Sequence, residues 1–262
     1  MSAHYPGGEM RPEIHVPGLS IKTFGVMFAL GFIAAGAVLG RRFQELGKPV
    51  DWAYEMIFAA LVGGLVGSRV YYLVQHRNDL HGGLLSNVFS GTGLVWYGGA
   101  LGGMLAVFLW AYRRQFLGLV LLDLAAPALA LGYAIGRIGC QVSGDGDYGK
   151  ASDLPWAMPY PHGTVPTDIS VHPTPIYETL AMGLVAWLLW RWRDSFRPGL
   201  LFAAYLVLSG IERLLVEFIR RNSDVALGLT APQLESVALI VLGALWVAWA
   251  GRRGGLRPAP VA

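Results

Sequence analysis

Apolar residues follow one another along this chain in seven long stretches, each separated from the next by a shorter polar segment. The stretches lie near residues 21–40, 54–75, 93–112, 116–141, 174–193, 198–219 and 231–250. A helix that crosses the hydrocarbon core of a membrane needs about 20 predominantly apolar residues. The pattern therefore predicts an all-α, polytopic membrane protein with seven transmembrane helices.

The composition supports this interpretation, since 54% of the 262 residues are hydrophobic and only 14% are charged. A soluble domain of this length could not bury so much apolar surface in a single core. The seven stretches leave no segment long enough for a separate soluble domain, a nucleic-acid module or a dinucleotide-binding fold. We expect a membrane domain over residues 21–250, an extracytoplasmic segment at 1–20 and a basic cytoplasmic tail at 251–262.

The Lys and Arg residues divide unequally between the two predicted faces of the membrane. Eleven of the 20 lie on one face and six on the other, while Arg69, Arg137 and Arg213 fall inside spans. Cytoplasmic loops carry the excess of positive charge, so the N-terminus should lie outside and the C-terminus in the cytoplasm. The long connection at 142–173 then lies outside, and we expect the functional site to face that side.

Ionisable residues inside spans are costly in hydrocarbon and usually mark function. Arg69 lies about 15 residues, or roughly 22 Å, from the cytoplasmic start of its helix, and the same reckoning brings Arg137 and Arg213 to a similar depth. Tyr97, Glu178 and Glu217 fall at this level too. Three guanidinium groups at one depth favour an anion such as a lipid phosphate. The alternative is that each arginine reaches to the interface or forms a structural ion pair, for example Arg213 with Glu217.

Glycines punctuate the segment GRIGCQVSGDGDYGK at residues 136–150, which carries Asp145 and Asp147 at its tip. The spacing is not that of a calcium loop, because Gly149 stands where a third oxygen ligand is required. We expect no metal here; the glycines allow the backbone to approach a headgroup, or form an ordinary turn. Elsewhere, glycines four apart favour close packing of helices. These pairs are Gly63 with Gly67, Gly98 with Gly102 and Gly132 with Gly136.

Four segments together carry a resemblance to a known family. They are GRIGCQVSGDGDYGK, WYGGALGG at 96–103, HPTPIYE at 172–178 and ERLLVEFIRR at 212–221. By their order along the chain and their register they resemble the corresponding segments of prolipoprotein diacylglyceryl transferases. The resemblance implies a bacterial inner-membrane enzyme that needs no cofactor. Such an enzyme transfers the diacylglyceryl group of phosphatidylglycerol to the lipobox cysteine of a preprolipoprotein signal peptide, which forms a thioether and releases glycerol phosphate.

The resemblance also implies roles for individual residues. The signature arginine that contacts the lipid headgroup falls on Arg137, and its closing glycine falls on Gly149. We predict Arg137, Arg213 and Tyr97 as catalytic residues. Predicted substrate-binding residues are Arg69, Gly98, Gly99, Gly136, Gly139, Asp145, Gly149, His172, Tyr177, Glu178 and Glu217.

The sequence departs from the family pattern in three segments. Tyr97 stands where the family often has a histidine that has been proposed to activate the thiol. Phe24 replaces a tyrosine, and Cys140 with Asp145 or Asp147 replaces an asparagine and a glutamate. Two other functions stay open on the sequence: an anionic-solute transporter lined by the same arginines, and an inactive relative that binds lipid or lipoprotein.

Overall fold

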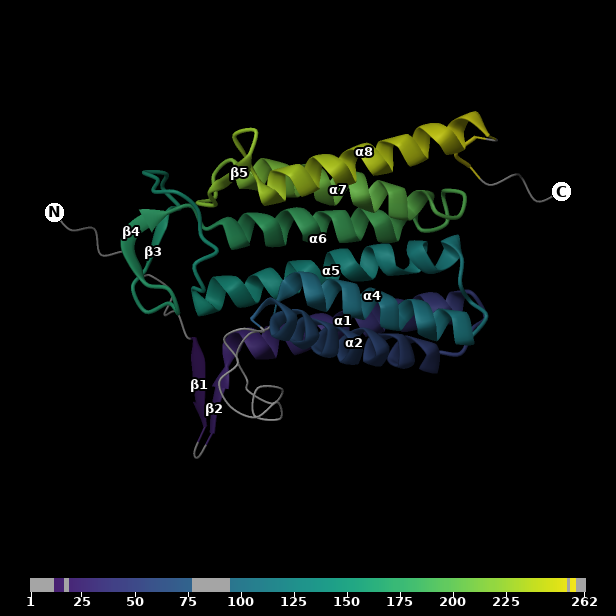
Figure 1. Ribbon diagram of the computed structural model, residues 1–262, viewed down its shortest axis with the longest axis horizontal. Coiled ribbons are helices and arrows are strands. Elements are labelled where there is room, and N and C mark those ends of the chain that lie inside the picture. Colours follow the sequence, from purple (N-terminus) through teal and green to yellow (C-terminus); the bar gives the residue numbers. More distant parts are fainter. Residues whose placement is uncertain (1–11, 17–18, 77–94, 254, 258–262) are drawn as a thin grey trace. The chain divides into compact units, whose positions relative to one another are not determined.

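A computed structural model describes residues 12–16, 19–76, 95–253 and 255–257 (Figure 1). Its described residues form α1 (Thr23–Glu45), α2 (Asp51–Gln75), α4 (Trp96–Arg113), α5 (Leu119–Ser143), α6 (Thr174–Trp192), α7 (Leu200–Glu217) and α8 (Ala231–Arg252). Each of these helices coincides with one predicted apolar stretch. Four of them, α1, α2, α5 and α8, are long and apolar enough to cross a membrane. The chain is a polytopic, mostly helical membrane protein.

Three short antiparallel hairpins accompany the helices, and the all-α prediction omits them. They are β1 (Glu13–Val16) with β2 (Leu19–Lys22), β3 (Met158–Tyr160) with β4 (Thr167–Val171), and β5 (Asp224–Ala226) with β6 (Leu229–Thr230). Their strands have two to five residues. Such strands are too short for an alternating pattern to stand out in the sequence.

The chain divides into two compact units, one of residues 1–35 with 122–262 and one of residues 36–121. In the first unit α5, α6, α7 and α8 lie side by side (Figure 1). Its core places Ala126, Ala130 and Ala134 of α5 against larger side chains such as Met182 and Leu189 of α6. Small residues on α5 allow the neighbouring helices to approach closely.

A carboxylate on α5 caps the beginning of α7. The side chain of Asp123 accepts hydrogen bonds from the backbone N–H groups of Gly199, at 2.7 Å, and Phe202, at 2.9 Å. The first N–H groups of a helix have no partner within the helix, so these bonds satisfy donors that burial would otherwise leave unpaired. The cap fixes where α7 begins relative to α5, and therefore where its C-terminal end lies.

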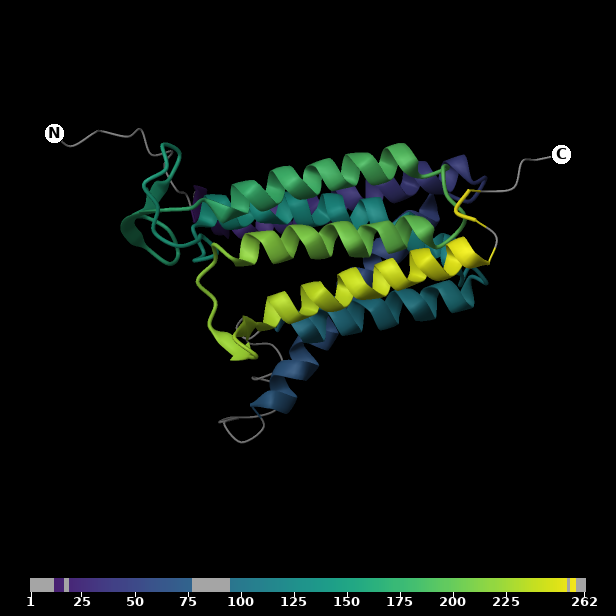
Figure 2. The same ribbon diagram turned by 90° about the horizontal axis from the view of Figure 1, so that it is seen from above.

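The connections after α5 and α7 meet at one end of the first unit. Both hairpins β3–β4 and β5–β6 lie at this end (Figures 1 and 2). The backbone N–H of Lys150 donates to the carbonyl of Ile219 over 2.8 Å, which ties the two connections together. The signature segment therefore lies beside the C-terminal end of α7.

In the second unit, α2 and α4 pack through glycines. A β-carbon placed on Gly67 would lie 2.7 Å from the Cα of Gly102, and one on Gly63 or Gly98 would meet the backbone of the facing helix. Any side chain there would push the helices apart. The predicted packing role of the pairs Gly63 with Gly67 and Gly98 with Gly102 is confirmed.

The third glycine pair behaves differently, in the first unit. A β-carbon on Gly132 would approach the carbonyl of Gly31 on α1 to 3.6 Å, whereas one on Gly136 would meet no atom within 4 Å. Only Gly132 lies at a helix contact. The expectation that Gly136 shares this packing role is wrong, because it faces open space.

Candidate active site

Arg137 lies near the C-terminal end of α5 and contacts carboxylates from two directions. Its Nε lies 2.9 Å from Oε2 of Glu178, and its Nη1 pairs with Oδ2 of Asp147. The guanidinium also lies over the ring of Tyr133, 4.8 Å from its centroid. These three contacts fix the orientation of the planar guanidinium group. The side chain of Arg137 is 15% exposed.

Glu178 stands in the second turn of α6 and joins two arginines. Its side chain is completely buried, and its Oε1 accepts a hydrogen bond of 2.7 Å from Nη1 of Arg213. The hydroxyl of Tyr133 reaches the same oxygen at 3.4 Å. An ionised carboxylate at this depth requires such partners, because desolvation of a lone charge is very costly.

Arg213 also pairs with Glu217 one turn further along α7, where Nη2 and Oε2 are 3.0 Å apart. The other carboxylate oxygen of Glu217 accepts hydrogen bonds from Asn222 at 2.6 Å and Thr230 at 2.8 Å. Thr230 in turn caps α8 through a capping box with Gln233. The Arg213 to Glu217 pair considered from the sequence is confirmed.

Arg220 closes these contacts into a circuit. Its Nη2 donates to Oδ1 of Asp147 over 2.5 Å, and its Nε lies 3.8 Å from Oε2 of Glu217. Positive and negative groups alternate around the circuit, three of each sign, so that their formal charges cancel. We call these six residues the arginine ring: Asp147, Arg137, Glu178, Arg213, Glu217 and Arg220.

The arginine ring holds its guanidinium groups rigidly without using all of their donors. A guanidinium carries five N–H groups. The ion pairs of Arg137 use Nε and Nη1, and those of Arg213 use Nη1 and Nη2. Among the described residues, Nη2 of Arg137 and Nε of Arg213 therefore keep donors that can bind the oxygens of a further anion. Because both side chains are already oriented, little rotamer entropy is lost when such an anion binds.

The two aspartates of the signature segment differ in their surroundings. Burial raises the pKa of Asp145, whose Oδ1 accepts the backbone N–H of Asp147 at 3.3 Å. Burial opposes ionisation of Asp147 too, but Arg137 and Arg220 outweigh it and hold the pKa of Asp147 below its ordinary value of 3.8. Of the two, Asp147 is the member of the arginine ring.

The thiol of Cys140 and the carboxylates of Asp145 and Asp147 each offer one atom within 4.8 Å of the others. This arrangement alone does not define a metal site. Both carboxylate oxygens of Asp147 already pair with guanidinium groups, and Nη1 of Arg137 also donates to the sulfur at 3.8 Å. Cations of the protein occupy the positions a metal would need, so we assign no metal here.

Gly149 is required at its position by close packing. A β-carbon there would lie 2.5 Å from the carbonyl oxygen of Ile219 and 3.0 Å from the Cβ of His172. Its N–H donates to the carbonyl of His172 over 2.8 Å. The glycine keeps the signature segment against the chain that follows α7, where Asp147 meets Arg220.

The remaining predicted residues of the first unit lie around the arginine ring or beside it. His172 and Tyr177 form a small cluster with Trp156, whose indole N–H donates to the Tyr177 hydroxyl over 2.6 Å. A β-carbon on Gly139 would lie 3.0 Å from the Cβ of Met27 on α1, so this glycine serves helix packing. Gly136 has open space beside it on α5.

Four of the predicted site residues belong to the second unit: Arg69, Tyr97, Gly98 and Gly99. Arg69 is buried on α2, its guanidinium 5.1 Å from the centroid of the Tyr72 ring. Tyr97 is the second residue of α4 and is half exposed. Gly98 packs against Gly67, and Gly99 lies near the carbonyl of Gly64. The convergence of Arg69 and Tyr97 with Arg137 stays a prediction.

Sequence reasoning missed Arg220 and left Asp147 only as an alternative to Asp145. The signal for Arg220 was its spacing, since Arg213, Glu217 and Arg220 follow one another at intervals of four and three. It also missed Glu212 of α7, which is buried and whose Oε1 has no hydrogen-bond partner among the described residues.

Fold and site together define an integral membrane protein that holds three arginines, paired with carboxylates, at one end of its helices. Such a site suits an anionic group attached to a lipid. A sequence model of the family Prolipoprotein diacylglyceryl transferase matches residues 13–249. The chain belongs to this family and is an enzyme of lipoprotein biosynthesis.

Individual relatives agree with the family. Over 232 residues the chain is 32% identical to a phosphatidylglycerol–prolipoprotein diacylglyceryl transferase of Clostridium tetani, covering 86% of this chain and 92% of the relative. It is 32% identical to one of Vibrio parahaemolyticus over 257 residues, covering 92% and 90%. One of Leptospira interrogans is 33% identical over 230 residues, covering 78% and 72%. Its activity is therefore that of a prolipoprotein diacylglyceryl transferase, and not that of a solute transporter.

Proposed function

We propose that Arg137 and Arg213 bind the phosphate of phosphatidylglycerol while its diacylglyceryl group is transferred to a cysteine thiol of a prolipoprotein. The observation that carries this proposal is the shared carboxylate of Glu178, which contacts Arg137 at 2.9 Å and Arg213 at 2.7 Å. One buried group thus fixes both guanidinium groups on neighbouring helices. A phosphate with several oxygens can bridge their unused donors.

The reaction breaks one bond and forms another at a glycerol carbon. The sulfur of the thiol attacks the carbon that bears the phosphate ester, and the carbon–oxygen bond breaks. Its electron pair stays on the phosphate oxygen, which leaves as glycerol phosphate, while the new carbon–sulfur bond is the thioether. The thiol proton must pass to a base or to solvent.

Negative charge grows on the phosphate oxygens as the bond breaks, so donors fixed beforehand stabilise the transition state more than the ground state. The arginine ring supplies such donors, since contacts within the protein already orient both arginines. Arginine suits this role better than lysine, because its planar fork makes two parallel hydrogen bonds to phosphate.

Activation of the thiol requires less from the protein than stabilisation of the leaving phosphate does. A free cysteine has a pKa near 8.5, so a few per cent is thiolate at neutral pH. Tyr97 occupies the position where the family often has a histidine. We propose that its hydroxyl orients the thiol or the phosphate as a hydrogen-bond donor, a role that needs no proton transfer.

We further propose that all seven helices cross the membrane with the N-terminus outside, so that the arginine ring lies toward the extracytoplasmic face. The excess of Lys and Arg on the opposite connections supports this orientation. A reporter enzyme that works only outside the cytoplasm should be active when fused near Ser152 and inactive when fused after Arg253. The reverse pattern would contradict the orientation.

The function itself is tested with purified protein, phosphatidylglycerol and a lipobox peptide. Mass spectrometry should detect a diacylglyceryl group on the peptide cysteine. Arg137→Ala and Arg213→Ala should each abolish or nearly abolish this product, and lysine should restore little. Arg191→Ala, at the other end of α6 from Glu178, is the control and should retain activity. Full activity in a folded Arg137→Ala or Arg213→Ala protein would remove that arginine from the mechanism.

A further inference from the structure

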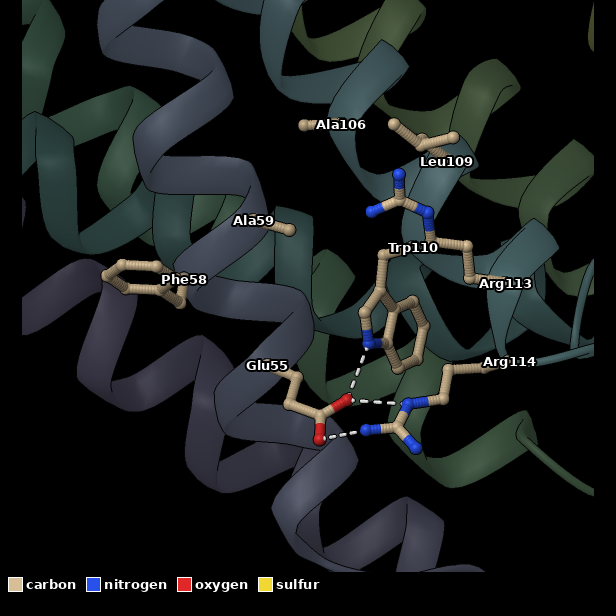
Figure 3. Close-up of a pocket in the computed structure, with 8 residues that line it drawn as sticks. All are labelled: Glu55, Phe58, Ala59, Ala106, Leu109, Trp110, Arg113 and Arg114. Carbon is tan, nitrogen blue, oxygen red and sulfur yellow. Dashed lines mark hydrogen bonds and ion pairs between the residues drawn. The ribbon is translucent and has the colours of Figure 1, made fainter.

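The second unit carries a groove that is lined by none of the residues assigned to the transfer reaction. It lies between α2 and α4 and has a volume of about 580 Å³, within the range of about 300–1,000 Å³ typical of ligand sites. Two alanines, Ala59 of α2 and Ala106 of α4, line it together with the larger Phe58 and Leu109 (Figure 3). These four side chains are apolar, and we call the part of the groove that they line the apolar channel.

A polar cluster closes one end of the groove. The carboxylate of Glu55 accepts hydrogen bonds from the indole N–H of Trp110 at 2.8 Å and from Nε of Arg114 at 2.9 Å. Nη2 of Arg114 pairs with the other oxygen of Glu55 (Figure 3). Glu55 therefore neutralises the charge of Arg114.

Arg113 has no such counter-charge. It is exposed, and among the residues that the structure describes it makes no ion pair and no hydrogen bond. Its guanidinium extends along the groove near Leu109 and Trp110 (Figure 3). With Glu55 and Arg114 paired, the groove keeps one net positive charge beside an apolar channel.

We propose that this groove binds an anionic glycerophospholipid, with the lipid phosphate on Arg113 and an acyl chain over Ala59 and Ala106. The charge of Arg113 matches a phosphate that the guanidinium can hold by two hydrogen bonds. The apolar channel matches the hydrocarbon chain. Trp110, apolar in its ring and polar at its N–H, stands at the boundary between these parts, as tryptophans do at membrane interfaces.

This site is separate from the one proposed for the transfer reaction and does not rest on it. Arg113 lies 16 residues from Tyr97 on α4, a separation of about 24 Å along the helix axis. The C-terminal end of a helix carries partial negative charge and by itself disfavours an anion. Binding should therefore depend on Arg113, which makes its substitution a decisive test.

The test uses the full-length protein in detergent and native mass spectrometry. The probes are phosphatidylserine and phosphatidylcholine with identical acyl chains, which differ in net charge. The wild type should hold phosphatidylserine at least about five-fold more tightly than phosphatidylcholine, about 1 kcal/mol. Arg113→Gln should remove this preference and Arg113→Lys should retain part of it. Arg191→Gln is the matched control and should retain it fully, since Arg191 lies at the C-terminal end of α6 and makes no ion pair with the residues that the structure describes.

Quenching of tryptophan fluorescence tests whether the lipid lies in the groove. The probe is phosphatidylserine that carries bromine on its acyl chains. Bromine should quench the wild type more than Trp110→Phe, because Trp110 lines the groove. Equal preference for phosphatidylserine in Arg113→Gln and in the wild type would overturn the proposal. So would a preference that is lost in Arg137→Gln but not in Arg113→Gln, since the lipid would then occupy the arginine ring. Equal quenching in wild type and Trp110→Phe would also count against it.

Discussion

Replacing Glu178 by glutamine tests whether the arginine ring positions the site. The two side chains have nearly the same shape, but the amide has no charge, and its NH2 group cannot accept a hydrogen bond from a guanidinium. In the native protein one oxygen of Glu178 contacts Arg137 and the other contacts Arg213, and no part of the side chain is exposed. Glu178→Gln therefore breaks one of these contacts and removes the carboxylate that the two arginines share, which leaves each arginine with a single carboxylate partner.

The expected loss of stability follows from the burial of the pair. Removing one partner of a buried ion pair typically costs about 3–5 kcal/mol, because it leaves a charge without compensation. Glutamine keeps one oxygen as an acceptor, so we expect the lower end, about 3 kcal/mol. For a chain of this length that corresponds to a fall in Tm of roughly 6–12 °C. Transfer should fall by about 100-fold, on the scale of an ångström displacement of a positioning group.

Thermal unfolding in detergent and peptide modification by mass spectrometry measure these two effects. Glu212→Gln is the matched control, since Glu212 is also a buried glutamate on a helix but forms no ion pair among the described residues. We expect it to change Tm by less than about 3 °C. The reasoning would be refuted if both variants lost the same stability, or if Glu178→Gln kept full transfer activity.

Three further outcomes are expected. The lowered pKa of Asp147 means that its stabilising contribution is complete at neutral pH and is lost only as the pH falls below about 4. Tm measured from pH 7 to 3 should therefore fall less steeply in Asp147→Asn than in the wild type. Gly149→Ala should destabilise the protein by about 1–3 kcal/mol, since the new β-carbon would meet the carbonyl of Ile219. Gly136→Ala, where the β-carbon meets open space, should not destabilise it. Equal Tm values for the two variants would contradict this reasoning. Tyr97→Phe should reduce transfer at least ten-fold, about 1.4 kcal/mol, and unchanged turnover would make Tyr97 an interfacial anchor.

The helices could be predicted from the sequence because each apolar stretch is long and ends at polar residues, prolines or glycines. α6, for example, covers Thr174–Trp192 against a predicted 174–193. The hairpins could not be predicted from the sequence. Strands as short as β5 and β6 form because of their tertiary surroundings and not because of a pattern of apolar and polar residues. Residues 77–94, which include the first two residues of the predicted stretch 93–112, lie outside the described residues.

The candidate site was predictable as far as helical geometry extends. Arg137, Glu178, Arg213 and Glu217 all lie on helices, where a fixed rise per residue converts sequence position into depth. Asp147 and Arg220 lie beyond the helix ends, where position in the sequence does not give depth. Their positions depend on tertiary contacts such as the hydrogen bond between Lys150 and Ile219.

The sequence left two interpretations of the arginines open, anion binding and structural ion pairing; the structure shows the ion pairs, and anion binding stays a proposal. Three buried or half-buried guanidinium groups in one cluster would repel one another, and each needs a counter-charge even without a substrate. Glu178 meets this need for Arg137 and Arg213 from a third helix, and still leaves donors on both. Structural pairing is therefore compatible with the proposed phosphate binding, because it keeps the arginines oriented. A lysine in either place would offer one point charge where the native side chain contacts two carboxylates and keeps a donor for the lipid.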